Sequence, residues 1–266
     1  MNRIRRTVAD LRALRGVRQL TMLHVESAEE AAAADAAGID LLSIEDPIWT
    51  AEMRAAAPNS FVFVGLLYGH LVTTEDYLRA AHRTLLLGGD AVYCAASLQT
   101  VERLAAEGIP VCGHAGLIPS KRTWTGGFRA VGRTADSAQL VFEQVKALED
   151  AGAFAAEIEV VPARVAAETA RRTSLLLISM GAGAGCDGQY LFSSDVLGSH
   201  DGHYPRHARV YRDFRAEHER LQKERVAAFG EFAADVASGA YPAVNHTVEI
   251  EDEEFAAFLR ALPKPR

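Results

Sequence analysis

Ionisable side chains stand near the ends of three short apolar runs, where they could carry acid–base chemistry. GIPVCGHAGL contains His114, AEIEVV contains Glu157 and Glu159, and DLLSIED ends on Glu45 and Asp46. Imidazole and carboxylate groups are the side chains that most often move protons in enzymes. In an extended chain Glu157 and Glu159 share one face, because successive side chains alternate. These residues are therefore candidates for a catalytic or binding site.

Two further apolar runs bring phenol, imidazole and thiol groups. Tyr68 and His70 follow FVFVGLL, and Tyr93 and Cys94 lie within AVYCAA. Phenol and imidazole groups can donate hydrogen bonds to an oxygen that becomes negative during a reaction. Tyr68, His70 and Tyr93 are therefore candidate site residues, whereas Cys94 is more typical of a core.

The glycine-rich stretch GAGAGCDGQ has two interpretations. Its backbone N–H groups could hold an anion, which would place Gly183 and Asp187 beside a substrate. It could also simply let one strand turn tightly into the next. It is not a nucleotide fingerprint, because it does not open a long helix with a matching acidic residue downstream.

The elements that position these groups alternate between apolar strands and amphipathic helices. Such alternation is typical of parallel α/β folds, and eight strands predict a closed (β/α)₈ TIM barrel. In this architecture the active site lies at the carboxyl ends of the strands, where the candidate residues are found. The predicted strands cover residues 20–25, 40–45, 60–67, 91–96, 109–115, 154–161, 175–180 and 190–194.

The segments outside the strands shape the site and the domain. Residues 116–133 predict a long polar loop, and loops of that length in compact domains are usually functional. A charged helix is expected from Pro205 to Gly239, followed by a linker and one short amphipathic helix. We predict a single domain over residues 1–266, with residues 205–266 as a helical extension of it.

Composition excludes several classes of protein. The net charge of −7 and pI of about 5.7 argue against a nucleic-acid partner. Three cysteines without metal spacing indicate a reducing compartment. The chain has neither a membrane-spanning apolar run nor the apolar core of a signal peptide. We therefore expect a cytoplasmic protein that acts on a small molecule.

Several stretches together resemble the ketopantoate hydroxymethyltransferase family, within the phosphoenolpyruvate mutase and isocitrate lyase superfamily. They include GHAGL, GGFRAVGR and GAGAGCDGQ, and run in the same order over most of the chain. The resemblance implies that Glu159 is the base that forms an enolate, with Glu157 as its closest competitor. It also implies that His114 contacts the substrate, that tetrahydrofolate carries the one-carbon donor, and that the chain forms a homo-oligomer, which is a decamer in the family.

The resemblance also implies a site for a divalent metal that holds the 2-oxo acid, and at this site the sequence departs from the family pattern. Asp46 matches the first metal aspartate, but Gly65 stands at the second, and Tyr93 and Ala95 replace the Lys-x-Glu motif. A single aspartate is a poor Mg²⁺ site, because that ion needs several oxygen ligands. Glu45 could substitute as a ligand only if the strand has ended, since neighbouring strand residues point to opposite faces.

Three functions remain open on this sequence. The first is enolate or aldol-type C–C chemistry on a 2-oxo acid or similar carbonyl compound, with weakened or absent metal dependence. Tyr93, Tyr68 and His70 would then supply hydrogen bonds to the oxyanion. The second is hydrolytic or decarboxylative cleavage on the same barrel. The third is a binding or scaffold protein without catalysis.

Overall fold

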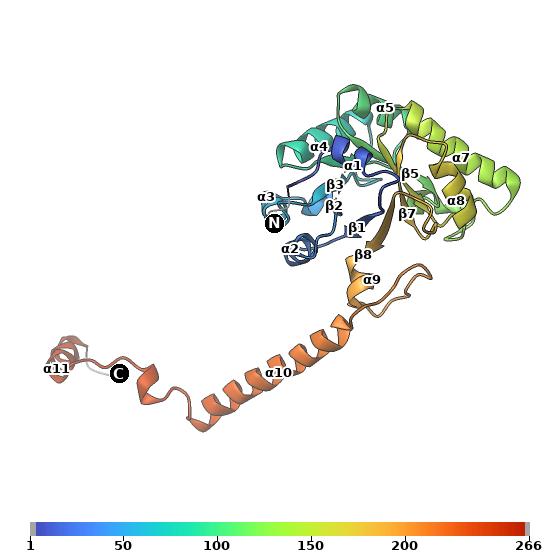
Figure 1. Cartoon of the computed structure of the whole chain (residues 1–266). Coiled ribbons are helices and arrows are strands. Elements are labelled where there is room, and N and C mark those ends of the chain that lie inside the picture. Colours follow the sequence, from blue (N-terminus) through green and yellow to red (C-terminus); the bar gives the residue numbers. More distant parts are fainter. Residues whose placement is uncertain (1–3, 264–266) are drawn as a thin grey trace. The chain divides into compact units, whose positions relative to one another are not determined.

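The structure, a computed structural model, describes residues 4–263, and its core is a closed barrel of eight parallel strands. The strands pair in chain order, and the last pairs with the first (Figure 1). The (β/α)₈ prediction is confirmed. The strands are β1 (Leu20–His24), β2 (Leu41–Glu45), β3 (Phe61–Gly65), β4 (Ala91–Tyr93), β5 (Val111–Gly116), β6 (Ala155–Glu159), β7 (Leu176–Met180) and β8 (Gly188–Phe192).

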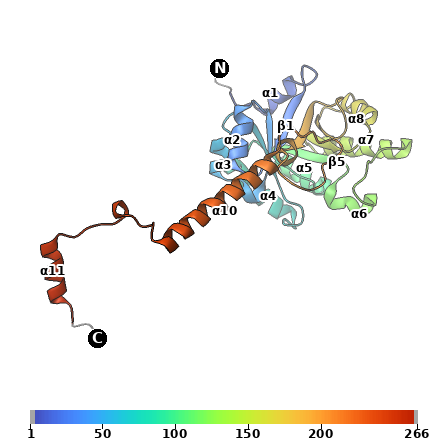
Figure 2. The same ribbon diagram turned by 90° about the horizontal axis from the view of Figure 1, so that it is seen from below.

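Helices surround the strands on the outside, as the two views of the ribbon show (Figures 1 and 2). Buried residues of these helices pack against outward-facing strand residues, as Leu148 does against the cluster that includes Ile158. The helices of this part are α1 (Val8–Ala13), α2 (Ala28–Ala36), α3 (Ala51–Ala56), α4 (Thr74–Leu86), α5 (Leu98–Ala106), α6 (Arg122–Thr125), α7 (Ala135–Asp150), α8 (Ala163–Ala170) and α9 (Ser193–Leu197), with 3₁₀ turns η1 (Asp46–Ile48) and η2 (Pro119–Lys121).

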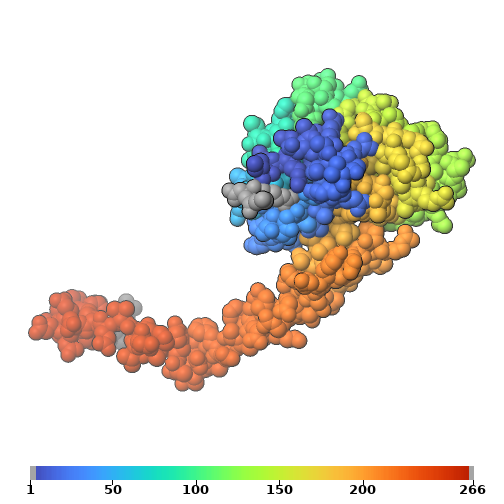
Figure 3. Space-filling view, in the orientation of Figure 1, coloured from blue at the N-terminus to red at the C-terminus, as the bar shows by residue number. Residues whose placement is uncertain are grey.

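Inside the barrel, apolar side chains fill the end from which the strands start. Leu20, Leu41, Phe61 and Leu176 belong to one buried cluster, and Leu11 of α1 joins it. Because Leu11 is fully buried among strand residues, α1 closes this end of the barrel. The N-terminal segment that contains α1 lies across the face seen in Figure 3. Solvent can therefore reach the barrel interior more readily from the carboxyl ends of the strands.

Two local predictions need correction. The loop at 116–133 contains η2 and the short helix α6, so it is partly helical. The last strand ends at Phe192 rather than at residue 194, since Ser193 already begins α9.

The chain divides into two compact units, residues 1–212 and residues 213–266. In the second unit the predicted long helix starts at Phe214 instead of Pro205, because the side chain of Asp213 caps its first turn. None of the described residues of this unit is buried, although several carry large apolar side chains. Its elements are α10 (Phe214–Ser238), η3 (Val244–His246) and α11 (Asp252–Ala261).

A membrane-spanning helix would need both length and high hydropathy. No helix in the part of the chain that the structure describes meets both requirements.

Candidate active site

A cavity of about 540 Å³ opens at the carboxyl ends of the barrel strands. Residues of all eight strands line it, because every second residue of a strand points into the barrel. Glu45, Tyr93, His114, Glu157 and Glu159 all line this cavity. It therefore has the position that active sites take in this architecture.

Four of the lining side chains, three of them buried and Tyr93 partly buried, form one hydrogen-bonded network. Nε2 of His114 lies 3.1 Å from Oε2 of Glu159, and the hydroxyl of Tyr93 donates to Oε2 of Glu157 at 2.7 Å. The same hydroxyl also bonds Nδ1 of His114. The chain of contacts thus runs from Glu159 through His114 and Tyr93 to Glu157. We call these four residues the Glu–His–Tyr network.

Strand register brings the network together. His114 of β5 pairs with Glu157 of β6, and Gly116 pairs with Glu159. Glycine at position 116 is required by φ = +82° and by the carbonyl oxygen of Glu159, which an added Cβ would approach to 2.5 Å. The strands can therefore lie close enough at their ends for the imidazole to reach Glu159 directly and Glu157 through Tyr93.

Burial and neighbouring charges set the protonation of the network. Burial raises the pKa of Glu157, and the nearby Glu159 adds to the rise. Burial by itself would lower the pKa of His114, but the carboxylates of Glu157 and Glu159 outweigh it and raise that pKa. Burial and Glu157 raise the pKa of Tyr93 well above its usual value. These shifts favour a neutral phenol at Tyr93 and a protonated imidazole at His114.

This protonation fixes the direction of each hydrogen bond. An imidazolium donates from both nitrogens, so His114 donates to Glu159 and to the Tyr93 oxygen. Tyr93 in turn donates its own proton to Glu157. A proton gained at one end of such a chain can be passed along it, which is the arrangement that general acid–base catalysis needs.

Several other predicted residues also lie at the cavity. Glu45, the last residue of β2, and Tyr68, in the loop after β3, line it. Gly65 and Ala95 line it as well, at two positions where the family resemblance implies acidic side chains. The cavity wall therefore lacks carboxylates at these two strand ends.

The structure does not bring Asp46 into the cavity. Asp46 follows the end of β2 and begins η1, so its side chain leaves the alternation of the strand. Its carboxylate accepts hydrogen bonds from Arg83 of α4, one of them at 2.6 Å to Oδ1. The expected metal ligand is therefore engaged in a contact with a helix outside the barrel strands.

Three more predicted residues also lie away from the cavity lining. His70 is exposed in the loop after β3. Gly183 packs on α8, where an added Cβ would come within 2.5 Å of the Ala163 Cβ, so close packing explains this glycine. Asp187 precedes β8 at the opposite end of the barrel, where its carboxylate lies 3.3 Å from Arg15.

The sequence did not single out several residues that line the cavity. Ser43 and Tyr190 face inward from β2 and β8, and strand alternation two residues before Glu45 is a signal that could have found Ser43. His24, Ser120, Asp195 and His207 complete the polar lining. Asp195 and His207 come from the segment after β8, whose path no sequence pattern predicted.

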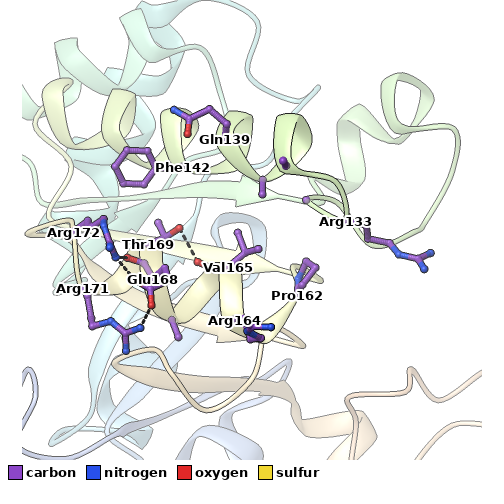
Figure 4. A pocket seen from close by; sticks show the side chains of 14 residues that line it. Arg133, Gln139, Phe142, Pro162, Arg164, Val165, Glu168, Thr169, Arg171 and Arg172 are labelled. Carbon is purple, nitrogen blue, oxygen red and sulfur yellow. Dashed lines mark hydrogen bonds and ion pairs between the residues drawn. The ribbon is translucent and has the colours of Figure 1, made fainter.

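A larger, open pocket lies outside the barrel between α7 and α8 (Figure 4). Its cavity is about 830 Å³, and it includes Gln139 and Phe142 of α7 and Arg164 of α8. Glu168 forms ion pairs there with Arg171 and Arg172. The acidic and imidazole groups of the Glu–His–Tyr network are absent from its lining, so it is not the candidate active site.

A closed (β/α)₈ barrel with a buried acid–base network at its carboxyl end defines the class of TIM-barrel enzymes. Comparison with known proteins then gives the family. The model of the ketopantoate hydroxymethyltransferase family matches residues 45–244. The chain therefore belongs to this family, which confirms the resemblance seen in the sequence.

The curated relatives are named 3-methyl-2-oxobutanoate hydroxymethyltransferase. The chain is 32% identical to the 3-methyl-2-oxobutanoate hydroxymethyltransferase of Nitratidesulfovibrio vulgaris, over 97% of this chain and 90% of the relative. It is 34% identical to that of Deinococcus radiodurans, over 83% of this chain and 84% of the relative. The match spans the strands that build the cavity.

Solved structures support the fold. A putative phosphonomutase from Burkholderia cenocepacia has a TM-score of 0.54 at 12% identity, covering 71% of this chain and 93% of that one. Oxaloacetate acetylhydrolase in complex with oxalate has a TM-score of 0.55 at 13% identity, covering 88% and 97%. A 2,3-dimethylmalate lyase of the PEP mutase/isocitrate lyase superfamily has a TM-score of 0.50 at 13% identity, covering 96% and 98%.

The residues present do not fit a metal at the positions that the family resemblance implies. Gly65 and Ala95 offer no ligand, and Asp46 faces Arg83. His114, Glu157 and Glu159 form a separate cluster whose ligand atoms lie within 4.8 Å of one another and could hold a metal ion. Both ring nitrogens of His114 in this cluster are already hydrogen-bonded to protein groups.

Proposed function

We propose that this protein catalyses enolate chemistry that forms a C–C bond on a carbonyl compound, with weakened or absent dependence on a metal. The observation that carries the proposal is the Glu–His–Tyr network in the cavity of a hydroxymethyltransferase-family barrel. The network can accept a proton and can also donate hydrogen bonds, which are the two functions that enolisation requires.

Glu159 is the proposed base. It is the last residue of β6 and lies at the cavity, whereas Glu157 is held deeper by Tyr93. Its carboxylate takes a proton from the carbon next to the carbonyl group. The electrons of that C–H bond form the C=C bond of the enolate, and the carbonyl π electrons move to the oxygen. The Nε2–H of His114 and the hydroxyl of Tyr93, which donate to Glu159 and Glu157 in the structure, are the proposed donors to that oxygen once they turn to the bound substrate.

The second step uses a one-carbon electrophile at the oxidation level of formaldehyde. The C=C electrons of the enolate form a C–C bond to it, and the enolate oxygen becomes a carbonyl again. The electrophile's π electrons move to its heteroatom, which takes the proton that Glu159 removed in the first step. The family resemblance predicts a tetrahydrofolate carrier for this unit, and that stays a prediction. Enolisation itself needs no electrophile, so it can be tested alone.

Hydrogen–deuterium exchange in D₂O followed by ¹H NMR tests the first step. We would use 3-methyl-2-oxobutanoate, other 2-oxo acids and their ethyl esters, each with Mg²⁺ and with EDTA. We expect exchange of the proton next to the keto group in EDTA, and a loss of about 10²-fold or more in Glu159→Gln, whose amide cannot act as the base. Exchange that requires Mg²⁺ would contradict the metal-independent mechanism.

The variant Glu157→Gln distinguishes the two carboxylates. Both are buried on the same face of β6, so the substitutions are matched in chemistry and environment. We expect Glu157→Gln to retain clearly more exchange activity than Glu159→Gln. The reverse order would assign the base to Glu157. Absence of exchange in the unmodified protein with every compound would refute enolisation.

We also propose that the chain forms a homo-oligomer. Phe229, Phe232 and Val236 of α10 share one helical face, and the structure leaves all three exposed. A unit without buried residues gains little stability from burial of its own apolar surface. A second copy of the chain is the proposed partner of this face.

A further inference from the structure

The charged groups around the cavity are mostly acidic. Glu45, Glu157, Glu159 and Asp195 line it, and none of its lining residues in the described part of the chain is Lys or Arg. An anionic ligand bound there would lie close to several carboxylates. Like charges at such distances repel strongly where water is partly excluded.

The three histidines of the lining do not compensate for these carboxylates. Burial lowers the pKa of both His24 and His207, so their imidazoles are uncharged at neutral pH. The positive charge of His114 is already used by its hydrogen bond to Glu159, at 3.1 Å. The cavity thus offers no free cationic side chain for the carboxylate of a 2-oxo acid.

The mouth of the cavity carries three exposed aromatic side chains. Tyr68 is 56% exposed, Phe128 68% and Phe192 41%. They come from the loop after β3, the segment after β5 and the end of β8, and all three line the same cavity. Exposed apolar groups gathered at a cavity from separate segments are typical of a surface that binds an apolar ligand.

The cavity wall also has room beside these aromatic groups. An added Cβ at Gly65 would have no neighbour closer than 3.8 Å, so glycine leaves unfilled at this strand end the place that a Cβ could take. Ala95 is the small residue at the next strand end. A substrate larger than a short 2-oxo acid can use this space.

From these observations we infer that the substrate is an uncharged carbonyl compound with a bulky apolar substituent, and not the anion of a short 2-oxo acid. The inference rests on the proposed function of the same cavity. The carbonyl group would lie at the Glu–His–Tyr network, and the apolar substituent would contact the aromatic residues at the mouth.

Binding of a matched pair of compounds tests the charge. We would measure by calorimetry the dissociation constants of 2-oxo-4-phenylbutanoate and of its ethyl ester, which share a carbon skeleton up to the ester group and differ in charge. In EDTA we expect the ester to bind about tenfold more tightly or better. Equal or tighter binding of the acid, in EDTA or after addition of Mg²⁺ or Mn²⁺, would overturn the inference, as would failure of both to bind.

Two variants with matched controls test which lining residues set the preference for an uncharged ligand and for an apolar substituent. Glu45→Gln removes a lining carboxylate, so it should strengthen binding of the acid relative to that of the ester, whereas Glu52→Gln on α3 lies outside the lining and should leave this ratio unchanged. Phe128→Ala should weaken binding of the ethyl ester of 2-oxo-4-phenylbutanoate several-fold but should not weaken binding of ethyl pyruvate. Trp124→Ala, in the same segment but 90% exposed and outside the lining, is its control.

The binding assay and the exchange assay test two separate claims. If the ester binds more tightly than the acid but no compound exchanges a proton, the proposed enolisation is refuted and the inference on charge stands. If exchange occurs but the acid is the tighter ligand, enolisation stands and the inference on charge is refuted. Circular dichroism of each variant establishes that it is folded.

Discussion

Replacement of Tyr93 by Phe tests whether the Glu–His–Tyr network exists as described. The substitution removes one oxygen from a partly buried ring and leaves the ring's other contacts in place. Two hydrogen bonds disappear: the one that Tyr93 donates to Glu157 at 2.7 Å, and the one that it accepts from Nδ1 of His114. Glu157 and His114 both stay buried without that partner.

The expected cost follows from these two lost contacts. Leaving a buried polar group without its hydrogen bond costs about 1–3 kcal/mol, so Tyr93→Phe should lower the free energy of unfolding by about 2 kcal/mol or more. For a chain of this size that corresponds to a decrease in Tm of roughly 4–8 °C. The pKa of Glu157 should rise further, because the bond from Tyr93 is among the contacts that lower it.

Urea unfolding followed by circular dichroism, together with thermal melts, measures this cost. Tyr68→Phe is the matched control, because that tyrosine lines the same cavity but is exposed and lies outside the network. It should leave stability within about 0.5 kcal/mol of the unmodified protein. If Tyr93→Phe is as stable as the control variant, the network does not hold these groups and the mechanism built on it is refuted.

Three other predictions concern pH, packing and assembly. The raised pKa of His114 adds stability that is complete below the unfolded value of about 6.5 and is lost as the pH rises through the folded value. The free energy of unfolding from urea titrations should therefore fall as the pH rises above about 6.5, by at most about 1.4 kcal/mol per pH unit for this proton, and the fall should be smaller in His114→Gln. Gly183→Ala should destabilise more than Gly69→Ala, since both have positive φ but only Gly183 has a close neighbour, the Ala163 Cβ at 2.5 Å; equal melting temperatures would contradict this packing. Phe229→Asp should shift the molar mass from light scattering toward that of one chain, and an unchanged mass would contradict the proposed use of the α10 face.

Much of the barrel could be predicted from the sequence because its strands are local features. Runs such as FVFVG are apolar on both faces, and they alternate with helices whose caps are also local. The same alternation predicts that Glu157 and Glu159 share a face, and the structure places both in the cavity. Matching motifs in the same order carried the family assignment, which the comparisons confirm.

The choice between Glu45 and Asp46 required the tertiary structure. Both carboxylates stand at the end of one strand, and the sequence matched Asp46 to the family's metal ligand. The strand continues through Glu45, which faces the cavity, and Asp46 begins a turn that directs it to Arg83. A strand that ends one residue earlier or later places a different side chain at the cavity, because side chains alternate between the two faces at every residue.

The sequence also could not predict which side chains from different strands contact each other. Tyr93 and Glu157 are separated by 64 residues along the chain, yet they are hydrogen-bonded because β5 pairs with β4 on one side and with β6 on the other. The segment after β8 brings Asp195 and His207 to the cavity without any periodic pattern. The sequence determines which groups are available at the strand ends, and the closure and register of the barrel decide which of them meet, because these contacts join residues far apart in the chain.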